Sequence, residues 1–236
     1  MSEPAAVLEG TALVKRYHGG DGSTVSVLDG VSLSVARGEI VAIVGASGAG
    51  KSTLLHVLGA LDAPTSGSVR IAGRDLVGLD DLAIAQLRNR SVGFVFQFHH
   101  LLREFSALEN VMMPLLIGGV DEGAARARAS SLLERVGLAS RSSHRPSALS
   151  GGEQQRTAVA RALATEPAVF LADEPSGNLD HGTAEVLHGL LISLARDLEI
   201  GMVLVTHNRS LAARADRVLL LEDGQLADVG ARHEVG

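Results

Sequence analysis

Nine consecutive residues, Gly45 to Thr53, constrain the fold of this 236-residue chain more than any other segment. They read G-A-S-G-A-G-K-S-T and match the phosphate-loop pattern G-x-x-x-x-G-K-[ST]. An apolar, β-branched run at residues 39–44 precedes the motif, and a helical pattern over about residues 50–60 follows it. Because a phosphate loop requires this order of strand, loop and helix, the segment predicts a nucleotide-binding α/β fold.

The chemistry expected of this loop follows from its backbone. Glycines let consecutive N–H groups curl around phosphate oxygens, and the following helix adds the positive end of its dipole. Lys51 is expected to reach the β- and γ-phosphates, and the Ser52 hydroxyl to ligate Mg²⁺. A glycine-rich turn that binds nothing is the alternative, which the strand and helix context disfavours. The expected ATP-binding residues are Gly45, Ala46, Ser47, Gly48, Ala49, Gly50, Lys51, Ser52 and Thr53.

The rest of the pattern predicts an α/β fold with a mostly parallel sheet. Residues up to about 35 alternate apolar and polar side chains, which indicates an N-terminal antiparallel β portion. Buried-type strands are expected at 169–172, 202–206 and 217–221, with helices between them. We expect one domain over residues 1–236, with a helical subdomain inserted at about 98–165.

Composition excludes several classes of protein. The chain has no cysteine, so disulfide frameworks, thiolate metal sites and cysteine nucleophiles are ruled out. Aromatic residues make up 3% and the formal net charge is −6, and both argue against nucleic-acid binding. The first residues do not form a signal peptide, and no run is long and apolar enough to cross a bilayer.

Acidic and histidine side chains follow two of the expected strands. Asp173 and Glu174 come directly after the first, and His207 follows the second. Ligands of open α/β sheets bind at the carboxyl ends of strands, so Asp173 is expected to hold Mg²⁺ and Glu174 to act as general base. His207 is expected at the same edge, within reach of the γ-phosphate. A solvated acidic strand end is the alternative that the phosphate loop makes less favourable.

A second anion-binding helix terminus precedes the acidic strand. Ser150 and Glu153 form a capping box, and Gly151 and Gly152 expose backbone N–H groups at the start of the helix. A well-capped surface helix is the simpler interpretation of this segment alone.

Taken together, these motifs resemble the ATP-binding-cassette ATPases over nearly the whole chain. In that resemblance Gln97 corresponds to an active-site glutamine that also ligates Mg²⁺. Ser150, Gly151 and Gly152 correspond to the signature motif, and Asp180 lies in a loop that contacts nucleotide. Tyr17 is similar to the aromatic residue that stacks on adenine. The resemblance implies a head-to-tail homodimer that closes over ATP and opens on hydrolysis.

A narrower resemblance lies in Phe96 to Val111 and Met113 to Gly118, where the chain is similar to the ATPases of the LolCDE lipoprotein-releasing complexes of Gram-negative bacteria. The part from Phe98 to Val111 lies just after Gln97. That similarity implies integral membrane partners of the LolC and LolE type, which would contact this segment. The chain would then work peripherally at the cytoplasmic face of the inner membrane. Two positions depart from the subfamily: Ser176 stands where Thr is frequent, and Asn208 where Asp is usual.

Two other functions remain open at this point. One is a related exporter or a cell-division cassette ATPase with different membrane partners. The other is a non-transport cassette protein that acts on DNA or ribosomes. The second class usually carries zinc modules, coiled coils or a second cassette, and the sequence indicates none of these.

Overall fold

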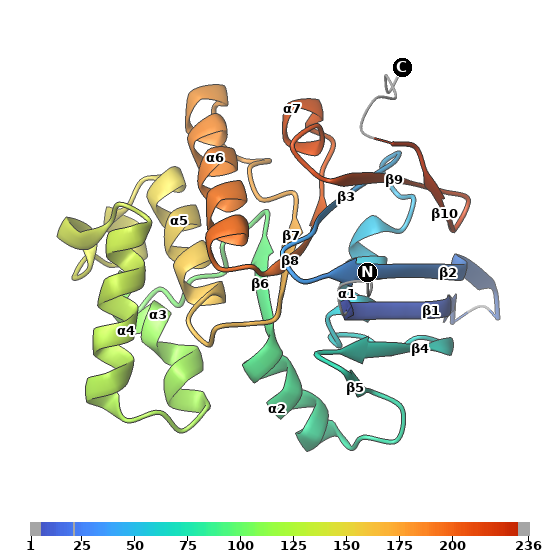
Figure 1. Ribbon diagram of the computed structural model, residues 1–236, viewed down its shortest axis with the longest axis horizontal. Coiled ribbons are helices and arrows are strands. Elements are labelled where there is room, and N and C mark those ends of the chain that lie inside the picture. The colour runs from blue at the N-terminus through green and yellow to red at the C-terminus, as the bar shows by residue number, and fades with distance from the viewer. Residues whose placement is uncertain (1–5, 21, 231–236) are drawn as a thin grey trace, which may run out of the picture.

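The computed structural model describes residues 6–20 and 22–230, which form two sheets with helices around them (Figure 1). The larger sheet has the strand order β10-β9-β3-β8-β7-β6, and only the edge strand β10 runs antiparallel to its neighbour. Its strands are β3 (Ile40–Val44), β6 (Val92–Phe96), β7 (Val169–Asp173), β8 (Gly201–Val205), β9 (Arg217–Glu222) and β10 (Gln225–Asp228).

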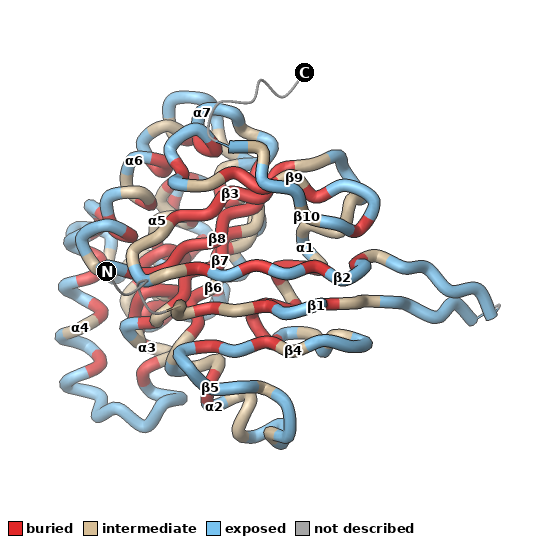
Figure 2. Tube along the Cα trace, turned by 45° about the vertical axis from the view of Figure 1, so that its right-hand side comes forward, coloured by how far each residue is buried: buried red, intermediate tan, exposed pale blue. Residues whose placement is uncertain are grey.

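Alternation along the central strands divides the apolar side chains between two cores. In β3, Ile40, Ala42 and Val44 join one cluster, whereas Val41 and Ile43 join the other. The strands β7 and β8 alternate in the same way, and Figure 2 shows all three strands buried at the centre of the molecule. Side chains of a strand point alternately to the two faces, so each face can be covered by different elements.

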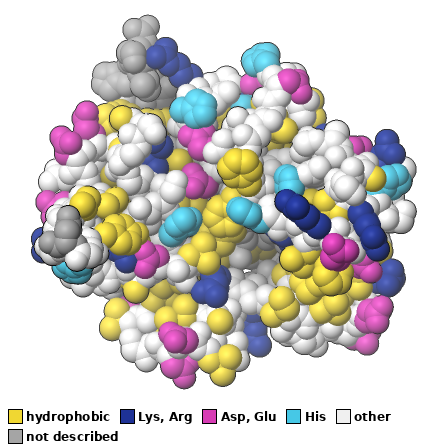
Figure 3. Space-filling view, turned by 180° about the vertical axis from the view of Figure 1, so that it is seen from behind, with side chains coloured by type: hydrophobic (Ala, Val, Ile, Leu, Met, Phe, Trp, Pro, Cys, Tyr) yellow, Lys and Arg dark blue, Asp and Glu magenta, His cyan; other side chains and the backbone are white. Residues whose placement is uncertain are grey.

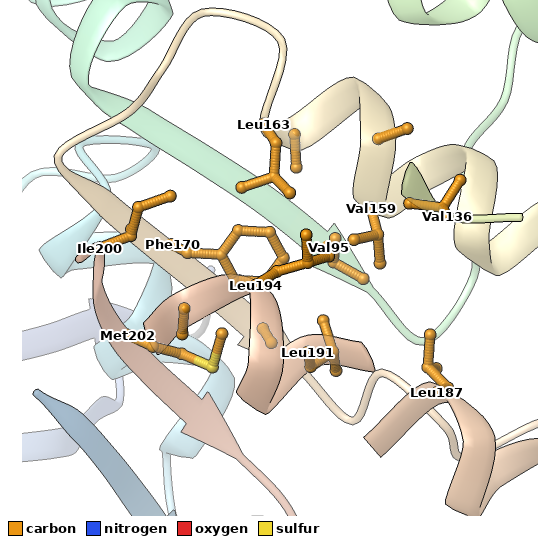
Figure 4. Packing of buried hydrophobic residues seen from close by; sticks show 14 of the residues in the cluster. Val95, Val136, Val159, Leu163, Phe170, Leu187, Leu191, Leu194, Ile200 and Met202 are labelled. Carbon is orange, nitrogen blue, oxygen red and sulfur yellow. The ribbon is translucent and has the colours of Figure 1, made fainter. Parts of the chain in front are cut away.

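Helices α3 to α6 cover the first face. Phe170 of β7 packs there among Val159 of α5, Leu163 directly after α5, and Leu194 of α6 (Figure 4). The four helices are α3 (Ala107–Ile117), α4 (Glu122–Arg135), α5 (Gly151–Ala162) and α6 (His181–Asp197). Short 3₁₀ turns at Ala139–Arg141 and Pro146–Ala148 join α4 to α5.

The second face is covered by α1 (Lys51–Leu58) and by the smaller, antiparallel sheet. That sheet has the order β2-β1-β4-β5. Its strands are β1 (Ala6–His18), β2 (Thr24–Ala36), β4 (Ser66–Ile71) and β5 (Arg74–Asp75). Helix α2 (Asp81–Ser91) leads from it into β6, and α7 (Arg209–Ala212) follows β8.

The expected mostly parallel core and N-terminal antiparallel portion are confirmed. The expected capping box forms at Ser150 on α5, and another forms at Ser106 on α3. The strands β5 and β10 were not expected. Both are short and mostly exposed, so they lack the apolar alternation that marks a strand in sequence. Each forms by pairing with a preceding strand across a turn.

Candidate active site

The phosphate loop lies between β3 and α1, at the carboxyl end of a central strand. Its helix begins without a side-chain cap: Gly50 occupies the N-cap position with φ 96°, in the left-handed region. A β-carbon on Gly45 would collide with the carbonyl oxygen of Leu221, so this position needs glycine. The ammonium of Lys51 donates to the carbonyl oxygens of Gly45 (2.9 Å) and Ala46 (2.8 Å). The loop therefore holds the Lys51 ammonium against its own backbone, and no side chain caps the first N–H groups of α1.

Glu174 and His207 meet at the same edge of the sheet. Strands β7 and β8 are neighbours, and Asp173 pairs in register with Val205, so the residues after them lie side by side. The Glu174 carboxylate lies 2.9 Å from Nδ1 of His207. Glu174 has φ 46°, and its backbone N–H donates to the carbonyl of Val205. A left-handed non-glycine residue at such a point is typical of a strained functional site.

Gln97 lies in the loop after β6 and contacts the segment after Glu174. Its amide nitrogen donates to Asn178 (3.1 Å), and Asn178 donates back to the Gln97 carbonyl (3.2 Å). A β-carbon on Gly177 would approach the Gln97 side chain to 2.9 Å, so glycine allows this close packing. Sequence reasoning missed Asn178, since a lone asparagine in a turn carries no distinguishing signal.

The three oxygen donors expected to bind magnesium fit that metal. Ser52 offers a hydroxyl, Asp173 a carboxylate, and Gln97 its amide oxygen, while the Gln97 amide nitrogen donates to Asn178. Mg²⁺ prefers oxygen ligands and is usually held by one or two carboxylates together with substrate phosphates. Within residues 6–20 and 22–230, no cluster of three or more histidine or acidic side chains could hold a metal by itself. The donor set therefore suits a metal that arrives with a nucleotide.

The start of α5 is capped by its own side chains. Ser150 accepts a hydrogen bond from the N–H of Glu153 (3.3 Å), and the Glu153 carboxylate accepts from the N–H of Ser150 (2.8 Å). The bond from the Ser150 N–H, together with the Ser150 hydroxyl, lowers the pKa of the Glu153 carboxyl. Arg141 donates to the same carboxylate at 3.1 Å. The structure does not bring this terminus to the phosphate loop, because α5 and α1 cover opposite faces of the sheet.

Asp180 is the N-cap of α6 in this structure. It accepts hydrogen bonds from the backbone N–H (3.0 Å) and the hydroxyl (2.6 Å) of Thr183, which lower its pKa. The cap fixes the end of the loop that begins at Glu174. A contact between Asp180 and nucleotide stays a prediction.

Tyr17 lies near the tip of the β1–β2 hairpin, with 44% of its surface exposed. Its hydroxyl donates to Asp62 (2.9 Å), which also accepts from Lys15 (2.7 Å). The Lys15 ammonium lies over the Tyr17 ring, 4.9 Å from its centroid. Burial alone would raise the pKa of Asp62, but the hydrogen bonds from Lys15 and Tyr17 hold it below its ordinary value. Asp62, which sequence reasoning did not identify, thus orients the ring.

The segment from Phe98 to Val111 has both buried and exposed residues. Phe98 (64% exposed), Leu102 and Phe105 present apolar surface to solvent. Leu101 and Val111 are instead buried, and Asn110 is buried with its amide bonded to the carbonyls of this loop. Only the exposed members of the segment can contact another protein directly.

Comparison with known proteins assigns the chain to a family. The family model described as ABC transporter matches residues 28–177. The chain belongs to the ABC transporter family. Within that family it resembles the lipoprotein-releasing system ATP-binding protein LolD of Xanthomonas campestris, with 58% identity over 95% of this chain and 94% of the relative. It is 55% identical to LolD of Geobacter metallireducens, over 94% of this chain and 98% of that one.

Solved structures agree with this assignment. The fold of this chain matches that of the ATP-binding cassette MJ0796, in a dimeric structure described as a post-hydrolysis state bound to ADP and Pi. The TM-score is 0.87 and the identity 37%, over 96% of this chain and all of that one. Among residues 6–20 and 22–230, we find no helix with the length and apolar character that a membrane span needs.

Proposed function

We propose that this chain is the ATP-hydrolysing subunit of an ABC transporter. The observation that carries the proposal is the strand order β3-β8-β7. The phosphate loop follows β3, His207 follows β8 and Glu174 follows β7, so a nucleotide-binding loop and an acid–histidine pair share one edge of the sheet. The match to an ATP-binding cassette described as bound to ADP and Pi supports hydrolysis as the reaction.

In the proposed reaction, a water oxygen attacks the γ-phosphorus of ATP. Glu174 accepts the proton of that water, and the bond between the γ-phosphorus and the bridging oxygen breaks, so ADP departs with the electron pair. Lys51 and the N–H groups of the phosphate loop stabilise the charge on the phosphate oxygens. His207 holds the Glu174 carboxylate and contacts the γ-phosphate. Ser52, Asp173 and Gln97 would hold Mg²⁺, which would supply positive charge to the triphosphate.

Tyr17 is proposed to stack on adenine. Lys15 covers one face of its ring, and the bond from its hydroxyl to Asp62 fixes the ring plane. The opposite face is then the one offered to a base. Asp180 completes the proposed set of nucleotide contacts.

The active form is proposed to be a homodimer. The phosphate loop and the signature terminus at Ser150 to Gly152 belong to helices on opposite faces of the sheet, so one chain cannot close both around one triphosphate. In a head-to-tail pair, each chain supplies one of these termini to each ATP. The dimeric MJ0796 structures support this arrangement.

Lipoprotein release is the proposed transport process, because relatives with 52–58% identity are named as its ATP-binding proteins. The partners would be membrane subunits of the LolC and LolE type, bound through the exposed residues between Phe98 and Val111 at the cytoplasmic face of the inner membrane. We also propose that residues 1–236 act as one cassette domain, with residues 98–165 as its helical subdomain. On the face seen in Figure 3, Lys and Arg side chains are scattered among acidic and apolar ones, which does not favour a nucleic-acid partner.

The membrane partnership is tested by purification from detergent extract. Tagged wild-type chain should retain two kinds of integral membrane subunit, identified by mass spectrometry. Phe98→Ala should reduce the retained subunits about tenfold, because truncation of a central aromatic contact typically weakens an interface by about this much. Val186→Ala on α6 is the control, since Val186 is similarly exposed (61%). Equal retention by both variants would show that Phe98 is not part of the interface. If the wild-type chain retains no membrane protein at all, that result would contradict the proposed transporter function.

A further inference from the structure

Helix α6 carries a fully buried histidine that the proposed mechanism does not use. His188 has no exposed surface. Its Nε2 lies 2.7 Å from the Ser176 hydroxyl, in the loop that begins at Glu174. Its Nδ1 lies 3.2 Å from the carboxylate of Glu185, one turn earlier on the same helix. An imidazole without exposure that has a partner at both nitrogens is held in one orientation.

The partners determine which nitrogen of His188 carries the proton. An ionised carboxylate can only accept, so Nδ1–H donates to Glu185. The Nε2 atom of the neutral ring is then an acceptor, and the Ser176 hydroxyl must donate to it. Burial lowers the pKa of His188, and the bond to Glu185 opposes this only in part. The charge of Arg214 after α7 and the nearby His181 on α6 also lower that pKa, which favours the neutral ring.

Glu185 connects this histidine to the segment that follows His207. The same Glu185 oxygen accepts a hydrogen bond from the Ser210 hydroxyl at 2.7 Å. Ser210 also lies 2.8 Å from the side-chain oxygen of Asn208, which caps α7 by accepting from the N–H of Leu211. Arg214 pairs with the second oxygen of the Glu185 carboxylate. A continuous set of side-chain contacts thus runs from Ser176 to Asn208.

The two ends of this set are adjacent to the two residues that meet at the active site. Ser176 is two positions after Glu174, and Asn208 directly follows His207. The loops are already joined by the contact between Glu174 and His207. These contacts form a second connection between the same loops, through His188 and Glu185 of α6, and only His188 among its members is buried.

We propose that His188 is a positioning residue, which fixes the loop after Glu174 relative to the loop after His207 through the hydrogen bonds Ser176–His188–Glu185–Ser210. The inference rests on the proposed ATPase function and deepens it. Fixing both loops holds the Glu174 carboxylate at one distance from His207, and small displacements of a catalytic base lower turnover strongly. ATP binding itself depends on the phosphate loop and Tyr17, which the connection does not include.

Steady-state ATP hydrolysis by the full chain tests the proposal with His188→Met, Ser176→Ala and the double variant. Met keeps the volume of the side chain but forms neither hydrogen bond. Each single variant should lower kcat about tenfold while KM for ATP changes less than twofold, since a lost hydrogen bond of this kind is worth about one decade in rate. The double variant should be no slower than the slower single one, because both changes break the same connection.

Two further variants distinguish positioning from stability. His188→Gln can again present an acceptor to Ser176 and should recover part of the lost kcat. Ser193→Ala removes another hydroxyl of α6, one that donates to the exposed Asp197, and should leave kcat unchanged. Losses that multiply to about a hundredfold in the double variant, or equal losses with Met and Gln, would overturn the positioning role. A wild-type chain that hydrolyses no ATP would overturn the proposed function, and this inference with it.

Discussion

The two helix termini expected to bind phosphate differ in how their N–H groups are used. At α1 the N-cap is Gly50, no side chain caps the helix, and Lys51 lies against its own loop. At α5 the Ser150 and Glu153 side chains satisfy each other's backbone groups, and Arg141 adds a cation to the box. The terminus of α1 is therefore free for a ligand within one chain. The terminus of α5 is a stable, partly satisfied structure that is suited to complete a site in another chain.

This difference explains why both termini are needed in the proposed dimer. A helix N-terminus without a cap costs stability, which bound phosphate can restore. A capped terminus retains free N–H groups only at its first positions, here Gly151 and Gly152, and offers a weaker anion site of its own. We therefore expect α1 to govern binding of ATP and α5 to govern closure and turnover.

The largest effect is expected from Glu174→Gln. This change should stop hydrolysis while ATP stays bound between the α1 terminus of one chain and the α5 terminus of the other. Loss of the general base should lower kcat about 10³-fold, while both phosphate-binding termini stay intact. Size-exclusion chromatography with ATP should then show a dimer that the wild-type chain does not accumulate. Persistent hydrolysis, with no additional dimer, would show that Glu174 is not the base.

Lys51→Ala should impair only the α1 terminus, at which ATP binds. Removal of the ammonium should weaken ATP binding about 100-fold, since a charge-assisted hydrogen bond to phosphate contributes about 2–3 kcal/mol. Isothermal titration calorimetry measures this, with Arg126→Ala as a charge control on the exposed surface of α4. An affinity within threefold of wild type would mean that Lys51 does not contact the phosphates.

Ser150→Ala should impair the α5 terminus, and therefore turnover, while the chain still binds ATP. We expect about a tenfold loss of kcat with the same affinity of the monomer for ATP, because this terminus acts only after the dimer closes. Ser106→Ala is a matched control: it removes the same kind of capping box from α3, with bonds of 2.7 and 3.2 Å. Both variants should lose about 1 kcal/mol of helix stability. Equal kcat for the two would mean that the α5 terminus does not take part in the reaction.

The smallest effect is expected at Asp62, which orients the Tyr17 ring. Asp62→Asn should lower the Tm by about 2–4 °C at pH 7, since a partly exposed ion pair contributes up to about 1 kcal/mol. The folded state lowers the pKa of Asp62, so its contribution is present above the ordinary value of 3.8 and is lost as pH falls through the lower folded value. The difference in Tm between wild type and Asp62→Asn should therefore shrink at low pH. A difference that does not depend on pH would contradict the role of the carboxylate charge.

Most of the fold was predictable because its signals are local. Each central strand is a short apolar run, each capping box is a pattern of four residues, and the phosphate loop is contiguous. The strands that were missed, β5 and β10, pair through exposed residues that resemble turns. Their pairing depends on a neighbouring strand and not on their own periodicity.

The candidate site was predictable in its members but not in its contacts. Lys15 illustrates the limit: no local pattern in the sequence pairs it with Asp62, whereas the folded chain does. Leu101 lies within a segment expected to bind a partner, yet it is buried, while Phe98 is exposed. Which side of a loop faces the core depends on packing against distant elements, and a single sequence does not contain this information.

The sequence by itself determined the family resemblance, the strand ends that carry Asp173, Glu174 and His207, and the loop that starts α1. These are short-range patterns set by backbone chemistry. Only the tertiary structure decided that Glu174 meets His207, that α1 and α5 cover opposite faces of the sheet, and that His188 bridges two loops from within the core. Each of these depends on strand order and register between residues far apart in the chain, and the long-range packing of apolar faces fixes both.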